Sequence, residues 1–560
     1  MTNKKIRWDF WTIVTVVIIA LFALFLLYPL ISLFLSGFKD TETGVWTIDN
    51  YARFFSKKYY KSALLNSFKL TFCVTVVAIV LGVPLAYFMS FYKIKGKGVL
   101  EILFIISMMS PNFIGAYSWI LLLGRSGTVT QFLKSLGIHM PSIYGFGGML
   151  LVFALKLYPF IYMYVSGALK KIDVALSEAA ESLGCGGLKK VFTVIMPLVT
   201  PTLIAAALLV FMNCMADFGT PALIGEGYRV MPTLVYSEFV GETGGSANFA
   251  ACMATIMVVV TATVFLLQKW YVNTKSFTMS SMRPIQPKEV HGIKGFFIHL
   301  FIYLLAATSI IPQCMVVYTS FRATKMQVFV DGFSLESYRK VFSTAVQSIK
   351  NTYLYCLAAI VIIVVLGMLI AYLAVRRKSW LTNMIDTIAM FPYIVPGSVL
   401  GITLLIAFNH PPMMLAGSAI IMVISLVIRR QAYTLRSSSA ILYQISPSME
   451  EAAISLGDSP SMSFVKVTAK MMLPGVASGA ILSWITLINE LSSSVMLYTA
   501  NTRTMSVAIY NEVIRASYGT AAALATILTV TTVVSLLIFF KVSGNKIGRA
   551  SCRERVWILV

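Results

Sequence analysis

The chain has 560 residues, of which 58% are hydrophobic and 12% are charged, and its mean hydropathy is +0.82. Ordinary soluble domains carry about 25% charged residues, so this composition excludes a soluble globular protein and indicates an integral membrane protein. The formal net charge of +23 does not indicate a nucleic-acid partner, because the basic residues lie between long apolar stretches.

Twelve apolar stretches follow one another along the chain, each long enough to cross a bilayer as a helix of about 20 residues. The first exceeds the apolar length of a secretory signal, about 7–15 residues, and no small-residue cleavage site follows it. We therefore predict an all-α integral membrane fold of twelve transmembrane helices that retains its first helix. The predicted spans are residues 11–36, 65–91, 99–123, 146–168, 199–224, 249–268, 296–318, 352–375, 384–407, 415–435, 477–499 and 520–541.

Basic residues cluster in alternate connections between these spans. Because positively charged loops stay on the cytoplasmic side, the pattern predicts an N-terminus inside the cell. A second basic group, between residues 53 and 61, falls on the opposite side in this arrangement. The clustered residues are Lys93, Lys95, Lys97, Lys170, Lys171, Lys189, Lys190, Arg376, Arg377 and Lys378.

The second half of the chain repeats the first. Asn66 in "LLNSFKLT" matches Asn351 in "SIKNTYLY" 285 positions later, and from the fourth span onward the offset is 273. Each half holds six spans, and because six is even the two halves share one orientation. The pairs at the second offset are Lys156 with Arg429, Glu178 with Glu451, Gly184 with Gly457 and Asp217 with Glu490.

This repetition divides the chain into a six-span half at residues 1–268, a polar cytoplasmic linker at 269–295 and a second six-span half at 296–545. The last stretch, residues 546–560, reads "KIGRASCRERVWILV". It resembles the translation of a sequencing-library adapter, and we expect it to be a non-native tail without function.

One phrase occurs twice in the longest predicted cytoplasmic loops: "SEAAESLG" ends at Gly184 and "EEAAISLG" ends at Gly457. Ser177 can cap a helix, acids in a first turn complement its dipole, and a glycine can end it in a left-handed turn. The phrase therefore predicts a short helix outside the bilayer in each half. A second helix is expected to follow, up to Pro197 in the first loop and Pro474 in the second.

With the "VFTVIMP" and "FVKVTAKMMLP" that follow, these phrases resemble the EAA loop in the membrane subunits of bacterial ABC importers of type I. The resemblance implies a multi-pass permease of the bacterial cytoplasmic membrane. It also implies two coupling helices that dock on a pair of separate ATPase subunits, and an extracytoplasmic solute-binding protein as a further partner. The implied coupling residues are Glu178, Ala179, Ala180, Gly184, Glu451, Ala452, Ala453 and Gly457.

The second loop departs from the family's spacing, because Gly457 to Pro474 is 17 residues whereas Gly184 to Pro197 is 13. Four residues make about one helical turn, so the second connector is expected to pack differently.

No stretch has the glycine and lysine spacing of a phosphate-binding loop. We expect no catalytic residues and no cofactor in this chain, with ATP and Mg²⁺ held by the partner ATPase and the two halves rocking in alternating access. The seven cysteines and four histidines lack ligand-like spacing, so no metal site is predicted either.

Ionisable and helix-breaking residues within the spans are candidates for a translocation path. Asp217 and Glu490 are predicted near the external mouth, where they either attract a cation or cap an outer half-helix. Lys156 and Arg429 are expected to pair with Glu101 and Asp386. The candidate breaks, which are either path walls or packing kinks, are Pro111, Asn112, Pro392 and Pro396.

The fused halves, with "DFGTPALIG" and "INELSSSVMLYT" after the loops, look most like ferric-iron and 2-aminoethylphosphonate importer permeases. Polyamine and thiamine relatives are less similar, and ferric iron is the expected substrate. An ion-coupled secondary transporter, which can also have twelve spans in two parallel halves, is the alternative class.

Overall fold

The computed structural model describes residues 9–109, 112–241, 246–274, 287–325 and 328–542. Within these residues the chain is helical apart from one two-stranded antiparallel hairpin. Pro111, the suspected tail at 546–560 and part of the linker at 269–295 lie outside the described residues.

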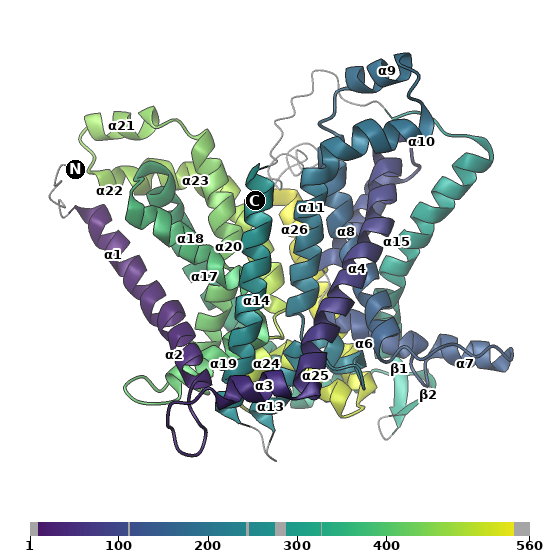
Figure 1. The fold of residues 1–560 in the computed structure, drawn as a ribbon, viewed down its shortest axis with the longest axis horizontal. Helices are drawn as coiled ribbons and strands as arrows, with labels where there is room; N and C mark the ends of the chain where they lie inside the picture. The colour runs from purple at the N-terminus through teal and green to yellow at the C-terminus, as the bar shows by residue number, and fades with distance from the viewer. Residues whose placement is uncertain (1–8, 110–111, 242–245, 275–286, 326–327, 543–560) are drawn as a thin grey trace.

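The first half runs from α1 to α14 (Figure 1). Its short π-helical segments are called η1 and η2 here. Its elements are α1 Phe10–Phe22, η1 Ala23–Leu27, α2 Tyr28–Gly37, α3 Asp49–Ser56, α4 Lys58–Phe91, α5 Lys97–Met109, α6 Asn112–Leu123, α7 Thr128–Ser135, α8 Phe146–Leu169, α9 Val174–Ser182, α10 Gly187–Lys190, η2 Val191–Ile195, α11 Met196–Ala216, α12 Gly219–Ile224, α13 Met231–Val240 and α14 Ala247–Thr274.

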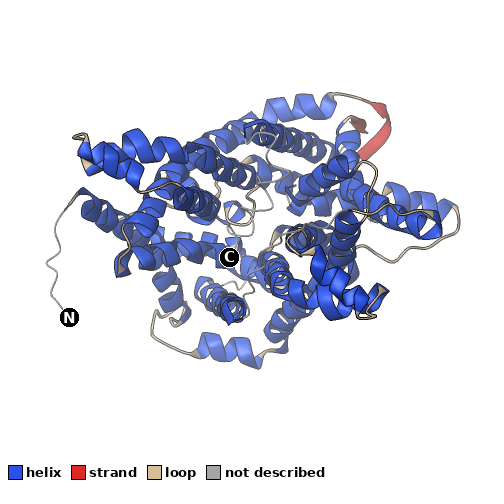
Figure 2. Ribbon diagram, turned by 90° about the horizontal axis from the view of Figure 1, so that it is seen from above, coloured by secondary structure: helices blue, strands red, loops and turns tan. Residues whose placement is uncertain are grey.

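The second half runs from α15 to α26 and contains the hairpin, which lies at the rim when the molecule is seen from above (Figure 2). Its elements are α15 Gly292–Ser320, β1 Arg322–Lys325, β2 Val328–Phe333, α16 Glu336–Thr344, α17 Val346–Arg376, α18 Trp380–Ile394, α19 Gly397–Phe408, α20 Ala419–Gln444, α21 Ser448–Ser455, α22 Pro460–Ser463, η3 Phe464–Thr468, α23 Ala469–Ile488, α24 Ser494–Leu497, α25 Met505–Ile514 and α26 Tyr518–Val542.

In the described residues, nine helices are long and apolar enough to cross a membrane, and two bent helix pairs raise the number to eleven. The remaining predicted span, 415–435, falls in α20. This helix carries three arginines, but it packs between α17 and α23 as α8 packs between α4 and α11. The architecture therefore agrees with two six-span halves, and α20 takes the place of the remaining span.

The bends occur where the sequence places its helix breakers. The α5–α6 pair bends by 102° and the α18–α19 pair by 110°. Pro392 lies inside α18 near its end, and Pro396 is the residue before α19. A proline removes a helical N–H and clashes with the preceding turn, so the predicted break at this place is confirmed.

The first helix of each half packs on the other half. The α1–α2 segment contacts α17, α18 and α19, and α15 contacts α5, α6 and α8. The two halves are therefore interlocked rather than side by side.

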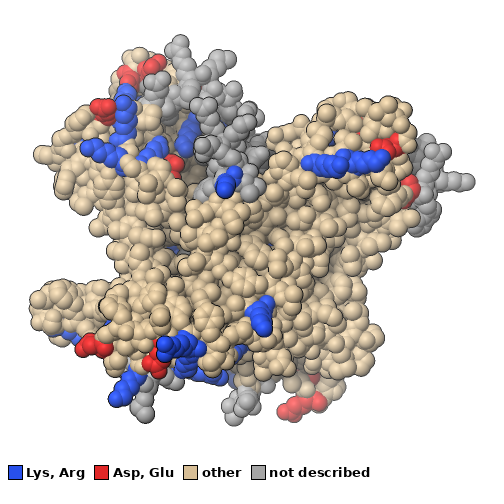
Figure 3. Space-filling model, turned by 180° about the vertical axis from the view of Figure 1, so that it is seen from behind, with Lys and Arg blue, Asp and Glu red and all other residues tan. Residues whose placement is uncertain are grey.

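The apolar surface forms a band around the molecule. Charged side chains gather near the two ends, with a broad band poor in charge between them (Figure 3). Phe72 and Val80 on the long helix α4, and Leu354 and Val361 on the long helix α17, are more than half exposed. Such a surface is stable only against lipid.

The asparagines that revealed the repeat have equivalent contacts. The Asn66 side chain donates to the carbonyl of Arg229 at 3.1 Å, and Asn351 donates to the carbonyl of Asn501 at 2.8 Å. The next residue in each half accepts a backbone N–H at the start of a further helix. The Ser67 hydroxyl receives it at 2.8 Å from α13, and that of Thr352 at 2.7 Å from α25.

Candidate functional site

The repeated phrases form two short helices, α9 and α21, at the same end of the molecule (Figure 1). Asp173 caps α9, and its carboxylate accepts a first-turn N–H at 2.9 Å. The prediction that Ser177 caps this helix is wrong: Ser177 lies inside α9, because the aspartate four positions earlier already supplies the acceptor. The second helix, α21, follows Pro447 and carries Glu450 and Glu451 in its first turn.

Both helices end in the same hydrogen-bonded turn. Gly184 has φ +77° and Gly457 has φ +100°, the left-handed region that favours glycine. In each loop the glycine N–H bonds to the carbonyl three residues back at 3.0 Å. The following N–H bonds five residues back, at 2.9 Å in the first loop and 3.1 Å in the second. This pair of bonds is a Schellman motif, and a Cβ at either glycine would meet no atom within 4 Å.

The C-terminal ends of α9 and α21 are open to solvent, and each carries an exposed leucine. Leu183 is 86% exposed and Leu456 is 90% exposed, the highest values for large hydrophobic side chains in the described residues. Sequence reasoning missed them, although they stand 273 positions apart just before the repeated glycines. Of the predicted coupling residues, Ala180 is buried, Ala453 is half-buried, and those exposed are Glu178, Ala179, Gly184, Glu451, Ala452 and Gly457.

The connectors after the two loops are built alike, which corrects the expectation that the second packs differently. α10 and η2 correspond to α22 and η3 at the offset of 273. At that offset Pro474 matches Pro201, and both prolines lie inside their helices, α23 and α11. Lys470 takes the place of Pro197. The longer glycine-to-proline spacing therefore reflects one absent proline and no inserted turn.

Each loop is tied to its connector by an exposed acid–lysine pair. Glu181 bonds to Lys190 in the first loop, and Asp458 bonds to Lys466 at 2.7 Å in the second. The hydrogen bond from Lys190 lowers the pKa of the Glu181 carboxyl. Exposed pairs of this kind contribute little to the free energy of unfolding. Their expected role is to orient the connector.

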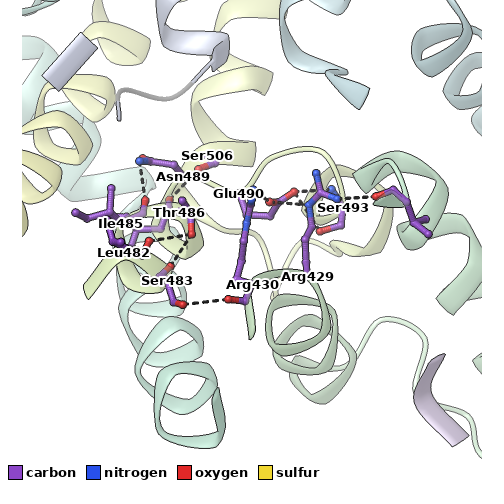
Figure 4. Close-up of polar contacts among 12 residues, drawn as sticks. Arg429, Arg430, Leu482, Ser483, Ile485, Thr486, Asn489, Glu490, Ser493 and Ser506 are labelled. Atoms are coloured by element: carbon purple, nitrogen blue, oxygen red, sulfur yellow. Dashed lines mark hydrogen bonds and ion pairs between the residues drawn. The ribbon is translucent and has the colours of Figure 1, made fainter. Parts of the chain in front are cut away.

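Buried charged residues interact within each half. The basic residue lies on α8 or α20, and the acidic residue follows α11 or α23. Lys156 on α8 interacts electrostatically with Asp217, which follows α11. In the second half Arg429 and Arg430, both on α20, form ion pairs with Glu490, which follows α23 (Figure 4). The Arg429 contact measures 2.9 Å, and the Glu490 side chain is 1% exposed.

The predicted pairing of Arg429 with Asp386 is therefore wrong. Asp386 pairs instead with Arg436 at 3.2 Å. Seven residues separate the two arginines, about 10 Å along a helix, so they lie at different depths. Lys156 interacts electrostatically with Asp217 and forms no ion pair with Glu101 in the described residues, and Glu101 accepts the Tyr162 hydroxyl at 3.3 Å.

Both buried carboxylates also accept a backbone N–H beside a short outer helix. Asp217 accepts the Thr220 N–H at 3.2 Å at the start of α12, and Glu490 accepts the Ser493 N–H at 3.3 Å before α24. They are 5% and 3% exposed, so neither carboxylate is open to solvent in this structure.

In the second half, Arg429 also contacts the break between α18 and α19. Arg429 donates to the Val395 carbonyl at 3.0 Å, in the gap between α18 and α19. A Cβ at Gly397 would approach the Arg429 guanidinium to 2.9 Å. The bend in α18–α19, the arginine and Glu490 therefore form one packed unit.

Known proteins resemble this chain over most of its length. A family model described as "Binding-protein-dependent transport system inner membrane component" matches residues 78–274 and again residues 341–547. The chain belongs to this family. It is a multi-pass inner-membrane permease subunit of an ABC importer, in which both permease halves are fused in one polypeptide.

Curated relatives include ferric and polyamine permeases. The chain is 27% identical over 525 residues to the "Ferric transport system permease protein FbpB" of Actinobacillus pleuropneumoniae, covering 92% of this chain and 76% of that protein. It is 26% identical over 485 residues to "Putative ferric transport system permease protein FbpB 1" of Haemophilus influenzae, covering 85% of this chain and 76% of that protein.

The similarity to a polyamine permease is confined to about one third of the chain. It is 31% identity over 190 residues to "Spermidine/putrescine transport system permease protein PotB" of Escherichia coli, covering 33% of this chain and 69% of that protein. Among solved structures, a bacterial ABC transporter involved in the import of alginate matches with a TM-score of 0.39 and 18% identity, covering 48% of this chain and 96% of that chain.

Proposed function

We propose that this permease carries ferric iron, driven by separate ATPase subunits that dock on α9 and α21 at the cytoplasmic side. The observation that carries the docking proposal is the pair of coupling helices, with the same Schellman turn and the same exposed leucine at one end of the molecule. We infer that the N-terminus lies on that side too, and the contact of Trp11 at the start of α1 with Phe464 in the second connector supports this. ATP and Mg²⁺ belong to the partner subunits.

The ferric substrate is supported by similarity to ferric transport permeases over 92% and 85% of the chain, whereas the similarity to the polyamine permease covers 33%. An extracytoplasmic binding protein delivers the substrate to the outer end. Uptake of radioactive ferric iron into cells that lack their own ferric importer tests this, with spermidine, thiamine and 2-aminoethylphosphonate as competing cargoes. Uptake of any of these in place of iron would overturn the substrate proposal.

Tryptophan substitution tests the docking proposal. Gly184→Trp and Gly457→Trp place a bulky residue in a left-handed conformation, which costs about 1–2 kcal/mol at a non-glycine residue. Both should reach the membrane normally but lose ATPase co-purification and uptake.

Gly96→Trp is the matched control. Gly96 has φ +71° and open space around it, but lies in the connection between α4 and α5. If both loop variants retain ATPase binding and transport, the docking role is refuted. Loss of uptake on adding a protonophore at maintained ATP would instead favour an ion-coupled secondary transporter.

The proposed path runs between the halves, past the Asp217 and Glu490 units and the bent pairs that contain Asn112 and Pro396. The two carboxylates act there through the basic residues that they hold. The cargo passes a packed wall of buried charged side chains rather than a carboxylate open to solvent.

A further inference from the structure

The N-terminal helix begins beside the second coupling loop (Figure 1). Trp11 on α1 is 2% exposed, and its ring lies 4.2 Å from that of Tyr372 and 5.1 Å from that of Phe464. The Tyr372 and Phe464 rings are themselves 4.9 Å apart. Three segments, α1, α17 and η3, therefore meet in one closed aromatic cluster, and such pairs contribute beyond simple burial.

The aromatic cluster continues into the coupling helix through hydrogen bonds. The Tyr372 hydroxyl donates to one carboxylate oxygen of Glu450, in the first turn of α21. The Thr468 hydroxyl donates to the other oxygen at 3.2 Å, and the Ser463 hydroxyl donates to the Glu450 backbone carbonyl at 3.2 Å. Hydrogen bonds to a carboxylate are among the stronger ones, so α21 is fixed to α17 and η3 through this single side chain.

The start of α1 is fixed as well. Asp9 caps the helix by accepting the Thr12 N–H at 2.8 Å, and it pairs with Arg377 at 3.5 Å. Arg377 follows directly after α17, the helix that carries Tyr372. Both ends of this contact region therefore join α1 to α17.

In the described residues, no aromatic and hydrogen-bonded chain of this kind joins α15, the counterpart of α1, to α9. At the repeat offsets, Tyr372 corresponds to Tyr87, but Glu450 corresponds to Ser177 and Phe464 to Val191. The start of α15, the counterpart of α1, presents Ile293, Phe296 and Phe297, which are 79%, 64% and 61% exposed. The shared fold therefore does not require the aromatic cluster.

We propose that Trp11, Tyr372 and Glu450 form a latch that makes α1 move together with the second coupling helix. These are positioning residues, and the latch rests on the proposed docking of an ATPase subunit on α21. The α1–α2 segment continues along the second half, where Phe25 lies 5.8 Å from Phe408 at the end of α19. A displacement of α21 is thereby passed to the outer end of the broken helix pair, a route that the first coupling helix lacks.

The test uses the complete permease, purified with its ATPase subunits and reconstituted in vesicles. Trp11→Ala and Tyr372→Phe should lower the number of ions transported per ATP hydrolysed by about 5- to 10-fold, the factor expected when a contact worth one aromatic pair or hydrogen bond is lost between two states. Association with the ATPase should persist, because the exposed face of α21 is unchanged. Trp11→Phe, which keeps a ring in the cluster, should restore most of the coupling.

The matched controls are Phe296→Ala on α15, the counterpart of α1, and Tyr87→Phe on α4, the counterpart of Tyr372. Both should stay within about twofold of the unmodified protein, because neither residue belongs to the proposed latch. If Trp11→Ala fails to reach the membrane, Tyr372→Phe decides, since it removes one hydroxyl and opens no cavity. Latch variants that couple as well as the controls, while binding the ATPase, overturn the latch alone. An unmodified permease that binds no ATPase overturns the proposed function and the latch with it.

Discussion

Replacing Glu490 by glutamine should destabilise the second half more than any other single change of charge in the described part of the chain. The carboxylate is shared by Arg429 and Arg430, whose side chains are only 12% and 20% exposed. Glutamine keeps the shape and an oxygen that can still accept the Ser493 N–H. The substitution therefore separates the effect of the negative charge from that of the hydrogen bond with the Ser493 N–H.

The magnitude follows from what is left behind. Breaking a buried ion pair costs about 3–5 kcal/mol because an uncompensated charge remains. Partial exposure of Arg430 places the expected loss near the lower bound, about 3 kcal/mol. Asp217→Asn should cost less, about 1–3 kcal/mol for one unsatisfied buried group. Asp217 interacts with one lysine, whereas Glu490 compensates two guanidiniums.

Thermal unfolding in mild detergent, followed by reaction of a thiol dye with the buried cysteines Cys214, Cys252 and Cys356, measures both losses. The double variant Arg430→Gln/Glu490→Gln should regain part of the stability, because one unpaired charge is removed with its partner. If Glu490→Gln is no less stable than Asp217→Asn, or if the double variant is additive, the shared ion cluster does not stabilise the fold.

Three further changes have defined outcomes. Leu183→Asp and Leu456→Asp should leave unfolding within about 0.5 kcal/mol, because both side chains are exposed, yet weaken ATPase co-purification. Arg429→Lys keeps the charge but not the geometry that reaches both Glu490 and the Val395 carbonyl, so unfolding stability should fall by about 1–3 kcal/mol and iron uptake should fall with it. The lowered pKa of Glu181 means that its stabilising effect is present above its ordinary value of 4.5 and is lost as the pH falls below it. The protection of α9 amides against hydrogen exchange, measured relative to the unfolded chain at the same pH, should therefore fall below that pH, but not in Glu181→Gln.

The local features of the coupling loops could be predicted because turn chemistry is local. A glycine at the end of a short polar helix predicts a left-handed turn whatever surrounds it, and both predicted glycines adopt one. The bend near Pro396 followed from the same kind of argument. The error at Ser177 was also local: a better cap, Asp173, stood one turn earlier and was not weighed.

The long-range pairings could not be predicted, because an ion pair in a membrane depends on depth and on which helix faces which. The repeat offset aligned Arg429 with Lys156 as equivalent positions but did not identify their ion-pair partners. Asp386 forms its ion pair with Arg436 instead. The exchange of first helices was hidden for a related reason. The sequence of a helix that is apolar on all sides does not indicate which helix it packs against. Only the structure shows that α1 packs on the second half.

The two halves share the same arrangement of helices but differ in their buried charged residues and in the contacts of α9 and α21. One buried carboxylate holds two arginines and its counterpart interacts with a lysine. One coupling helix is latched to α1, and the other has a serine where the latch needs a carboxylate. A permease built from two identical subunits carries every substitution on both sides, whereas a fused chain has each half once. In a fused chain, equal movements of two ATPase subunits can therefore produce unequal movements of the two halves. The latch variants test this through the number of ions transported per ATP hydrolysed.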